Sequence, residues 1–289
     1  MRAIDVEFLG LERVICAWQV GDVLIDPGPA PTLPTLLRAL GDWRPRALLL
    51  THIHLDHAGG AGALVRRWPE VEVYVHERGA PHVVDPSRLL ASAGRLYGEA
   101  HMGRLWGEVV PIPAERVRPL RGGETLPLAG GIRVAYVPGH ASHHVAYLHE
   151  ESGRAFVGDV AGVRIPPCDV TVAPTPPPDI DLEAWEASLD RIARWRPESL
   201  GLTHFGAVAD ATAQLEAART SLRDLAGLAR RGDADLVEHA VRSTLAREAD
   251  AATVEAYEAA VPPAHLYLGL ERYWRKRAER GDATGATGS

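Results

Sequence analysis

Three histidines and one aspartate lie within six positions, in the order His-x-His-x-Asp-His: His52, His54, Asp56 and His57. They follow an apolar run, residues 47–50, that predicts a buried strand, and the glycines after them predict a turn. Neutral imidazole and carboxylate are ligands for zinc, iron or manganese. A loop with merely exposed histidines is the alternative, but this spacing favours a metal site.

Three later segments also place a ligand-type side chain where a predicted strand ends. These side chains are His140, Asp159 and His204, which follow the predicted strands 132–137, 154–157 and 199–203. A glycine accompanies each of them, which indicates a turn. With the first four, they make seven candidate ligands, the number needed for two metals that share a bridging carboxylate and a bridging water.

The first motif resembles the signature of the metallo-β-lactamase fold superfamily, which includes hydroxyacylglutathione hydrolases, lactonases and phosphodiesterases. The resemblance covers roughly residues 1–206. It implies a first metal held by His52, His54 and His140, a second held by Asp56, His57 and His204, and Asp159 as the bridge between them.

The fold that this resemblance implies is α/β, a four-layer αββα sandwich with an all-helical C-terminal domain. We expect a catalytic domain over residues 1–206 and a helical domain over 207–282, where Ala, Leu, Arg and Glu dominate and no strand pattern occurs. Residues 283–289, rich in Gly, Thr, Ser and Ala, predict a disordered tail. A length of 289 residues is sufficient for one large domain and a smaller companion.

The ligand set predicts a hydrolase. Two divalent ions bring the pKa of a shared water near neutrality, and one can polarise a carbonyl oxygen. We expect a dinuclear zinc enzyme, with iron or manganese as alternatives, that cleaves an ester, thioester or lactone of a small metabolite. Asp56 and Asp159 are candidate catalytic residues, and Asp56 could orient the proton of the nucleophile. Tyr147 could donate a hydrogen bond to an oxyanion, although a tyrosine on a strand is more often in the core.

Other functions stay open at this point. The superfamily also contains mononuclear iron dioxygenases that act on persulfides, and phosphodiesterases. A non-catalytic binding protein is a third alternative. After Asp159, residues 160–162 are Val-Ala-Gly, where thioester hydrolases of the superfamily usually have Thr-Leu-Phe, so a glutathione thioester is in doubt. In their third motif, Pro-Gly-His-Thr-x-Gly-His, this chain has His143 in place of the second glycine, and His144 matches the last histidine.

Several polar residues outside the seven are predicted not to bind metal. Asp26, in Asp-Pro-Gly, is predicted to form a turn rather than to support the ligands. His76 is expected at the surface or at a cap, and His82 and His101 have no partner at metal spacing. The insertion 77–118 could cover a pocket, and residues 89–106 within it are expected to form a helix.

The basic side chains at 272–277 belong to a predicted helix and more often face solvent than an anionic substrate.

Composition argues against several classes of function. A net charge of −7 argues against a nucleic-acid-binding surface. Cys16 and Cys168 form no Cys-x-x-Cys pair and suggest a reducing compartment. No signal core and no apolar run of about 18 residues is present, so a cytoplasmic protein without a membrane span is expected. We expect a small-molecule substrate, no nucleic acid or membrane partner, and a homodimer as one possible assembly.

Overall fold

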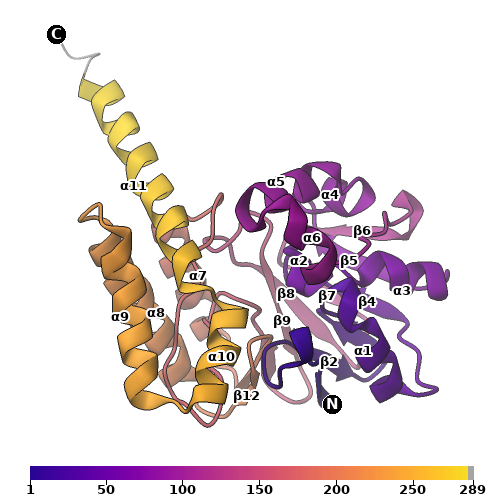
Figure 1. Cartoon of the computed structure of the whole chain (residues 1–289). Helices are drawn as coiled ribbons and strands as arrows, with labels where there is room; N and C mark the ends of the chain where they lie inside the picture. Colours follow the sequence, from indigo (N-terminus) through magenta and orange to yellow (C-terminus); the bar gives the residue numbers. More distant parts are fainter. Residues whose placement is uncertain (286–289) are drawn as a thin grey trace.

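The computed structural model describes residues 1–285, in which two six-stranded sheets stack face to face between helices (Figure 1). The first sheet, in spatial order, contains β1 (Arg2–Asp5), β2 (Cys16–Val20), β3 (Val23–Ile25), β4 (Ala47–Leu49), β5 (Glu72–His76) and β6 (Val117–Leu120). The second contains β12 (Gly206–Val208), β11 (Ser199–Leu202), β10 (Arg154–Phe156), β9 (Val145–His149), β8 (Ile132–Tyr136) and β7 (Thr125–Leu126). This is the predicted αββα sandwich, and the fold prediction is confirmed.

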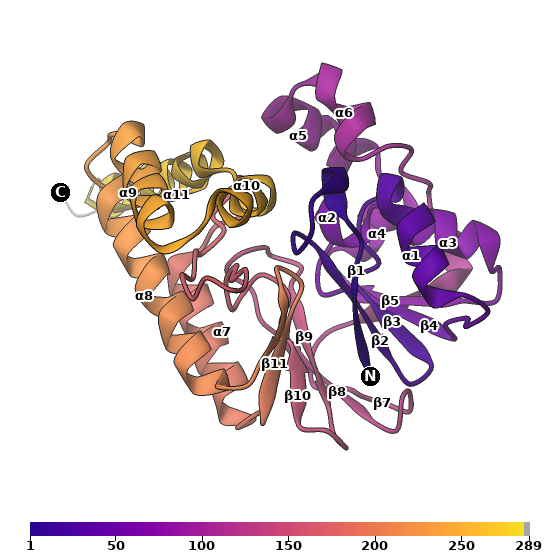
Figure 2. The same ribbon diagram turned by 60° about the horizontal axis from the view of Figure 1, so that its bottom comes forward.

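Helices flank the two sheets, on their outer faces and beyond one edge of the sandwich (Figure 2). On the side of the first sheet these are α1 (Leu33–Leu40), α2 (Leu55–Ala58), α3 (Ala61–Arg67), α4 (Ala80–Val84), α5 (Ser87–Tyr97) and α6 (Glu99–Leu105). On the side of the second sheet they are α7 (Leu182–Arg194), α8 (Ala211–Ala229), α9 (Ala234–Glu248), α10 (Ala251–Ala260) and α11 (Pro263–Gly285). Short 3-10 turns occupy Phe8–Gly10, Ala30–Thr32 and Ala114–Arg116.

The strand order explains why the candidate ligands gather at one edge. Strands β3, β4, β5 and β6 run parallel, so they are joined by helical crossovers and their carboxyl ends share an edge. In the second sheet β10 runs parallel to β11, which brings the ends of these two strands together as well. Loops that leave these ends can therefore place side chains from distant parts of the sequence around one point.

The space between the sheets is filled by apolar and aromatic side chains. Trp18 and Phe156 meet there edge to face with ring centroids 5.2 Å apart. Tyr147 is fully buried in the same cluster. Both cysteines are free and buried, and burial raises the pKa of the Cys16 thiol to about 12, so this thiol stays protonated.

Aspartate side chains begin four consecutive helices of the C-terminal half. Each accepts a hydrogen bond from a backbone N–H in the first turn, and they are Asp181 for α7, Asp210 for α8, Asp233 for α9 and Asp250 for α10. Helix α8 packs along α7, and α11 crosses α8 and α9. Residues 207–282, where a helical domain is expected, contain the helices α8 to α11.

Two predictions about helix boundaries are corrected by the structure. The single helix expected at 89–106 is divided into α5 and α6 at Gly98, whose φ of +82° does not fit a right-handed helix. Helix α11 continues to Gly285, three residues into the predicted disordered tail, and 286–289 lie outside the described residues. Within residues 1–285 no helix is both long and apolar enough to span a bilayer.

Candidate metal centre

The four clustered ligands are placed by the end of β4 and the short helix after it. His52 and His54 lie in the loop that follows β4, whereas Asp56 and His57 belong to α2. Asp26, in the neighbouring loop after β3, anchors this loop because its carboxylate accepts hydrogen bonds from the backbone N–H and the hydroxyl of Thr51.

A first group of ligand atoms comes from three loops. It contains His52, His54, His140 and Asp159, whose nearest nitrogen and oxygen atoms lie within 4.8 Å of one another. The Nε2 of His140 lies 3.0 Å from the Nδ1 of His54 and 3.3 Å from the Oδ2 of Asp159. This proximity of ligand-type atoms is what a single divalent cation requires.

A second group adjoins the first and contains Asp56, His57 and His204. The Nε2 of His204 lies 3.4 Å from the Oδ2 of Asp56. The Oδ1 of Asp159 lies 3.1 Å from the Nε2 of His57, while its other oxygen faces His140 of the first group. Asp159 therefore stands between the two groups with one oxygen toward each, the arrangement that bridging two metals demands.

The hydrogen bonds of the imidazoles direct their free nitrogens toward the centre. The Nδ1–H groups of His57, His140 and His204 donate to the Asp26 carboxylate, to the carbonyl of Pro174 and to the carbonyl of Val14, at 2.8, 2.8 and 2.6 Å. Among the described residues, the buried Nε2 atoms of His52, His57 and His204 have no hydrogen-bond partner. Buried polar atoms are almost always satisfied, so these unpartnered atoms fit metal coordination.

Burial and charge favour a cation at this point. Burial lowers the pKa of His52 and His140 and brings that of His54 to about 4, so these imidazoles are neutral at pH 7 and offer lone pairs. Burial opposes the ionisation of Asp159, yet the facing imidazoles, His57 first among them, hold its pKa well below the usual range. The first group thus offers neutral imidazoles, whereas in the second group the Asp159 carboxylate raises the pKa of His57 and His204 against the effect of burial.

Gly158 permits the approach of the Asp159 loop to the rest of the centre. Its φ is +48°, and a Cβ there would lie 2.6 Å from the Thr51 hydroxyl oxygen and 2.7 Å from the Nε2 of His144. The same His144 nitrogen accepts a hydrogen bond from the Asp159 backbone N–H at 3.2 Å. Any side chain at Gly158 would separate Asp159 from the residue that positions it.

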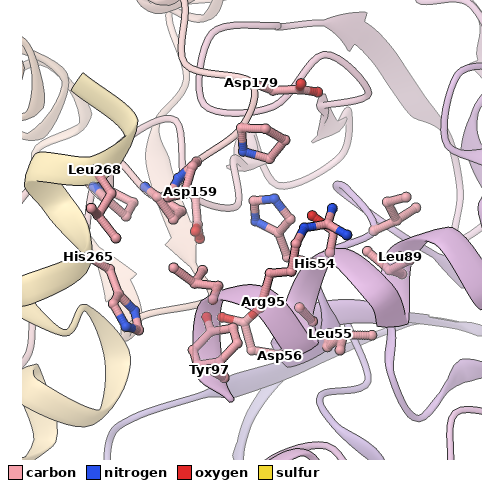
Figure 3. A pocket seen from close by; sticks show the side chains of 18 of the residues that line it. His54, Leu55, Asp56, Leu89, Arg95, Tyr97, Asp159, Asp179, His265 and Leu268 are labelled. Carbon is pink, nitrogen blue, oxygen red and sulfur yellow. The ribbon is translucent and has the colours of Figure 1, made fainter. Parts of the chain in front are cut away.

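A cavity of about 750 Å³ opens over the two groups, a volume suited to a small molecule. His54, Asp56 and Asp159 line its floor, and α5 and α11 supply walls (Figure 3). His143, the residue that replaces a glycine of the third motif, also lines the cavity, and its Nδ1 accepts from the Ile53 N–H at 3.4 Å.

The structure brings all seven predicted ligands together and places Tyr147 elsewhere. The Tyr147 hydroxyl donates to the Leu50 carbonyl at 2.8 Å, inside the core between the sheets, so it cannot reach an oxyanion in the cavity. The prediction for Asp26 is also corrected: it occupies the turn, with φ of +47°, but its buried carboxylate supports the ligands. His76 is buried and stacks on Tyr136 at 4.2 Å instead of lying at the surface.

Sequence reasoning missed the supporting role of Thr203 and the lining role of Arg95. Thr203 donates its hydroxyl to Asp26 at 2.9 Å, although 177 residues separate them. No local sequence signal marks that bond, because only the sheet topology brings these loops together. Arg95 lies in the insertion that was expected to cover a pocket. Its seven-residue spacing from Arg88 places both arginines on one face of a helix, and this was the available sequence signal that they line the cavity together.

Comparisons with known proteins agree with this geometry. The family model described as the metallo-beta-lactamase superfamily matches residues 21–204. The metallo-beta-lactamase fold-containing protein ST1585 of Sulfurisphaera tokodaii is 30% identical over 166 residues, which are 56% of this chain and 60% of that protein. The hydroxyacylglutathione hydrolase of Yersinia pestis (strain Pestoides F) is 30% identical over 186 residues, 62% of this chain and 54% of that protein. The chain thus spans little more than half the length of these curated relatives.

A solved structure in a metal-bound form is also similar to this chain. The crystal structure of TTHA1623 in a di-iron-bound form is similar, with a TM-score of 0.52 and 31% identity, over 68% of this chain and 89% of that chain. The matched family model covers well over half of this sequence and includes the four loops that carry the ligands. The chain belongs to the metallo-beta-lactamase superfamily.

Proposed function

We propose that this protein is a dinuclear metal-dependent hydrolase that cleaves an ester, thioester or lactone bond of a small metabolite. The observation that carries the proposal is the convergence of seven ligand-type side chains in two adjoining groups, three of which, His54, Asp56 and Asp159, line one cavity. When bound, two divalent cations supply Lewis acidity and lower the pKa of a shared water. One cation would be held by His52, His54 and His140, and the other by Asp56, His57 and His204. The Asp159 carboxylate would contact both cations.

Asp56 has a second role in this proposal, because its carboxylate also lines the cavity. Burial would raise its pKa, but His57 and His204 lower it to about 2, so it is ionised at neutral pH. An ionised carboxylate accepts a hydrogen bond from the attacking water and thereby orients it. The water oxygen adds to the carbonyl carbon, the C–O or C–S bond breaks, and a proton from the water goes to the leaving group.

Zinc is the metal that we propose, because three of the ligands of each cation are imidazole or carboxylate groups at close range. Iron is the competing candidate, since the similar TTHA1623 structure is a di-iron form. Elemental analysis of protein purified without added metal distinguishes them. About two zinc ions per chain supports the proposal, and two iron ions per chain would change the metal but leave the dinuclear site intact.

The test of the reaction is a panel of thioesters, lactones, carboxylic esters and phosphodiesters, assayed before and after chelation. Metal-dependent turnover of a carboxylic substrate supports the proposal. Less than one metal per chain, or turnover of phosphodiesters alone, would contradict it. A single iron with oxygen consumption on a persulfide would instead identify a dioxygenase.

We also propose that the protein acts in the cytoplasm on a small molecule, without nucleic acid or membrane partners, as a monomer or homodimer. The net charge of −7 supports the absence of a nucleic-acid partner. Light scattering of the purified protein measures the assembly. A stable complex with RNA at physiological salt would contradict this part of the proposal.

A further inference from the structure

We propose that the substrate carries a phosphorylated group, which binds to arginines at the mouth of the cavity while its carbonyl lies over the metal centre. This inference rests on the proposed hydrolase function and specifies the substrate class. The mouth is formed by helix α5 of the insertion 77–118 and by the C-terminal helix α11, neither of which contributes a metal ligand.

Helices α5 and α11 contact each other beside the cavity. The ring of Tyr97, in the last turn of α5, meets the ring of His265 on α11 edge to face, with centroids 5.1 Å apart. The same tyrosine ring meets Trp106 at 5.0 Å, and Trp106 is buried. These contacts hold the two helices on either side of one opening, as the labelled side chains show (Figure 3).

Five arginines line this opening, and we call them the arginine rim: Arg78, Arg88, Arg95, Arg272 and Arg275. Arg88 and Arg95 are seven residues apart on α5, two helical turns, so both face the same way. Arg272 and Arg275 are three apart on α11 and share a face in the same manner. Figure 3 shows Arg95 extending into the cavity that contains His54 and Asp56.

Of the five arginines of the rim, only Arg275 forms an ion pair among residues 1–285, with Glu271 at 2.7 Å. The Nε of Arg272 donates to the Pro178 carbonyl instead. The guanidinium groups of Arg88 and Arg95 on α5 form neither an ion pair nor a hydrogen bond within the described residues, so they are available to a ligand.

The arginine rim has a net positive charge, whereas the whole chain has a net negative charge. Outside the two metal groups, only Asp179 and Glu271 contribute carboxylates to the described lining, so five arginines leave an excess of three positive charges. The chain as a whole carries −7. A local positive mouth on an acidic protein attracts a multiply charged anion, and guanidinium groups bind phosphate oxygens in a bidentate manner.

The remaining wall suits an apolar part of the substrate. It includes Leu89, Leu96, Trp106 and Leu266. A molecule with an acyl group at one end and phosphates at the other would bury the first and place the second on the arginines. Glutathione thioesters, whose anionic groups are carboxylates partly offset by an ammonium, match this charge less well.

The experiment compares two acetyl thioesters that differ in the leaving group. One is acetyl-coenzyme A, which is phosphorylated, and the other is S-acetyl-N-acetylcysteamine, which is neutral. In the metal-loaded enzyme, kcat/KM should favour acetyl-coenzyme A by about tenfold or more, and added NaCl should reduce this preference. The double variant R88Q/R95Q should raise KM for acetyl-coenzyme A about tenfold without changing kcat. Its kcat/KM for the neutral S-acetyl-N-acetylcysteamine should equal that of wild type.

The matched control is R104Q, because Arg104 is an exposed arginine of α6 that does not line the cavity. The R104Q variant should have the wild-type kcat/KM for both thioesters. Equal losses for both thioesters in R88Q/R95Q, or a preference for S-acetylglutathione over acetyl-coenzyme A, would overturn the inference.

A binding measurement separates this inference from the hydrolase proposal. Calorimetric titration of the metal-loaded protein with adenosine 3′,5′-bisphosphate should show binding that R88Q/R95Q weakens and R104Q does not. If no thioester, lactone or carboxylic ester is hydrolysed but this binding persists, the hydrolase proposal fails and the phosphate site stands. If binding is absent, or is equal in wild type and R88Q/R95Q, the phosphate site is refuted.

Discussion

The Nδ1–H of His57 donates to the Oδ2 of Asp26 across 2.8 Å, with both side chains fully buried. The same carboxylate accepts the Thr51 hydroxyl, whose oxygen in turn lies 3.1 Å from the Nδ1 of His52. Asp26 therefore orients one histidine of each metal group, one directly and the other through Thr51. A single outer carboxylate thus governs how both Nε2 atoms face the centre.

Changing Asp26 to Asn is expected to reduce metal affinity about 10–100-fold, because the amide cannot accept from His57 and Thr51 with the strength of a carboxylate. Competition with a chromophoric chelator measures the affinity of each metal. Asp224→Asn, an exposed position on α8, is the control and should match wild type. Unchanged affinity in D26N would show that the network does not position the ligands.

Changing Asp159 to Ala is expected to remove about one metal per chain and nearly all turnover. Its two oxygens face His140 and His57, so its loss affects both groups. The loss of activity should exceed the roughly 10–100-fold expected for an outer residue such as Asp26. Circular dichroism checks the fold, and retained activity with two metals would contradict the bridging assignment.

Gly158→Ala is expected to lower the free energy of unfolding by about 2 kcal/mol or more, because φ is +48° and the new Cβ would overlap Thr51 and His144. Gly227→Ala is the matched control. Gly227 lies within α8 with no other atom within 4 Å of its Cβ position, so that change should stabilise by roughly 0.5–1 kcal/mol. Denaturant titration compares the two variants, and equal effects would exclude the proposed overlap.

Glu186→Gln is expected to cost about 1 kcal/mol at pH 7, since Glu186 on α7 pairs with Arg219 and Arg223 of α8, each at 2.6 Å. Hydrogen bonds from Arg223 first, and from Arg219, lower the pKa of Glu186 against the effect of burial. A lowered carboxyl pKa stabilises the folded state above the unfolded pKa, and this contribution is lost as pH falls through the folded value.

The difference between wild type and E186Q should therefore be largest near neutral pH and shrink below about pH 4. Thermal unfolding across this range measures it. The exposed Glu255 on α10 provides the control variant Glu255→Gln, which should follow wild type at every pH. A difference that grows toward low pH would contradict the assigned ion pairs.

The sequence indicated the candidate ligands, which the structure brings together, because each of them follows a predicted strand. His140, Asp159 and His204 all come after such strands, and a strand end fixes the direction of the loop that leaves it. The sandwich followed from the family resemblance and is confirmed. The division of the chain at residue 206 stays a prediction, although α8 packs directly on α7.

The errors concern residues whose role depends on distant partners. Asp26 has the local chemistry of a turn, and its bond to Thr203 exists only because the two sheets stack. Side chains along β9 point alternately to the two faces of its sheet. The face on which Tyr147 lies could not be assigned without knowing which face packs against the other sheet. Gly98, by contrast, interrupts the helical pattern of residues 89–106 in the sequence itself. It could have been used to predict that this segment forms two helices.

The contact between Tyr97 and His265 joins a segment near the middle of the chain to one near its end. Neither helix contains a candidate metal ligand, but both line the cavity. In the proposed function, substrate recognition and bond cleavage therefore take place in separate parts of the molecule. Redesigning α5 or α11 should retarget the enzyme to a different molecule while leaving its chemistry untouched.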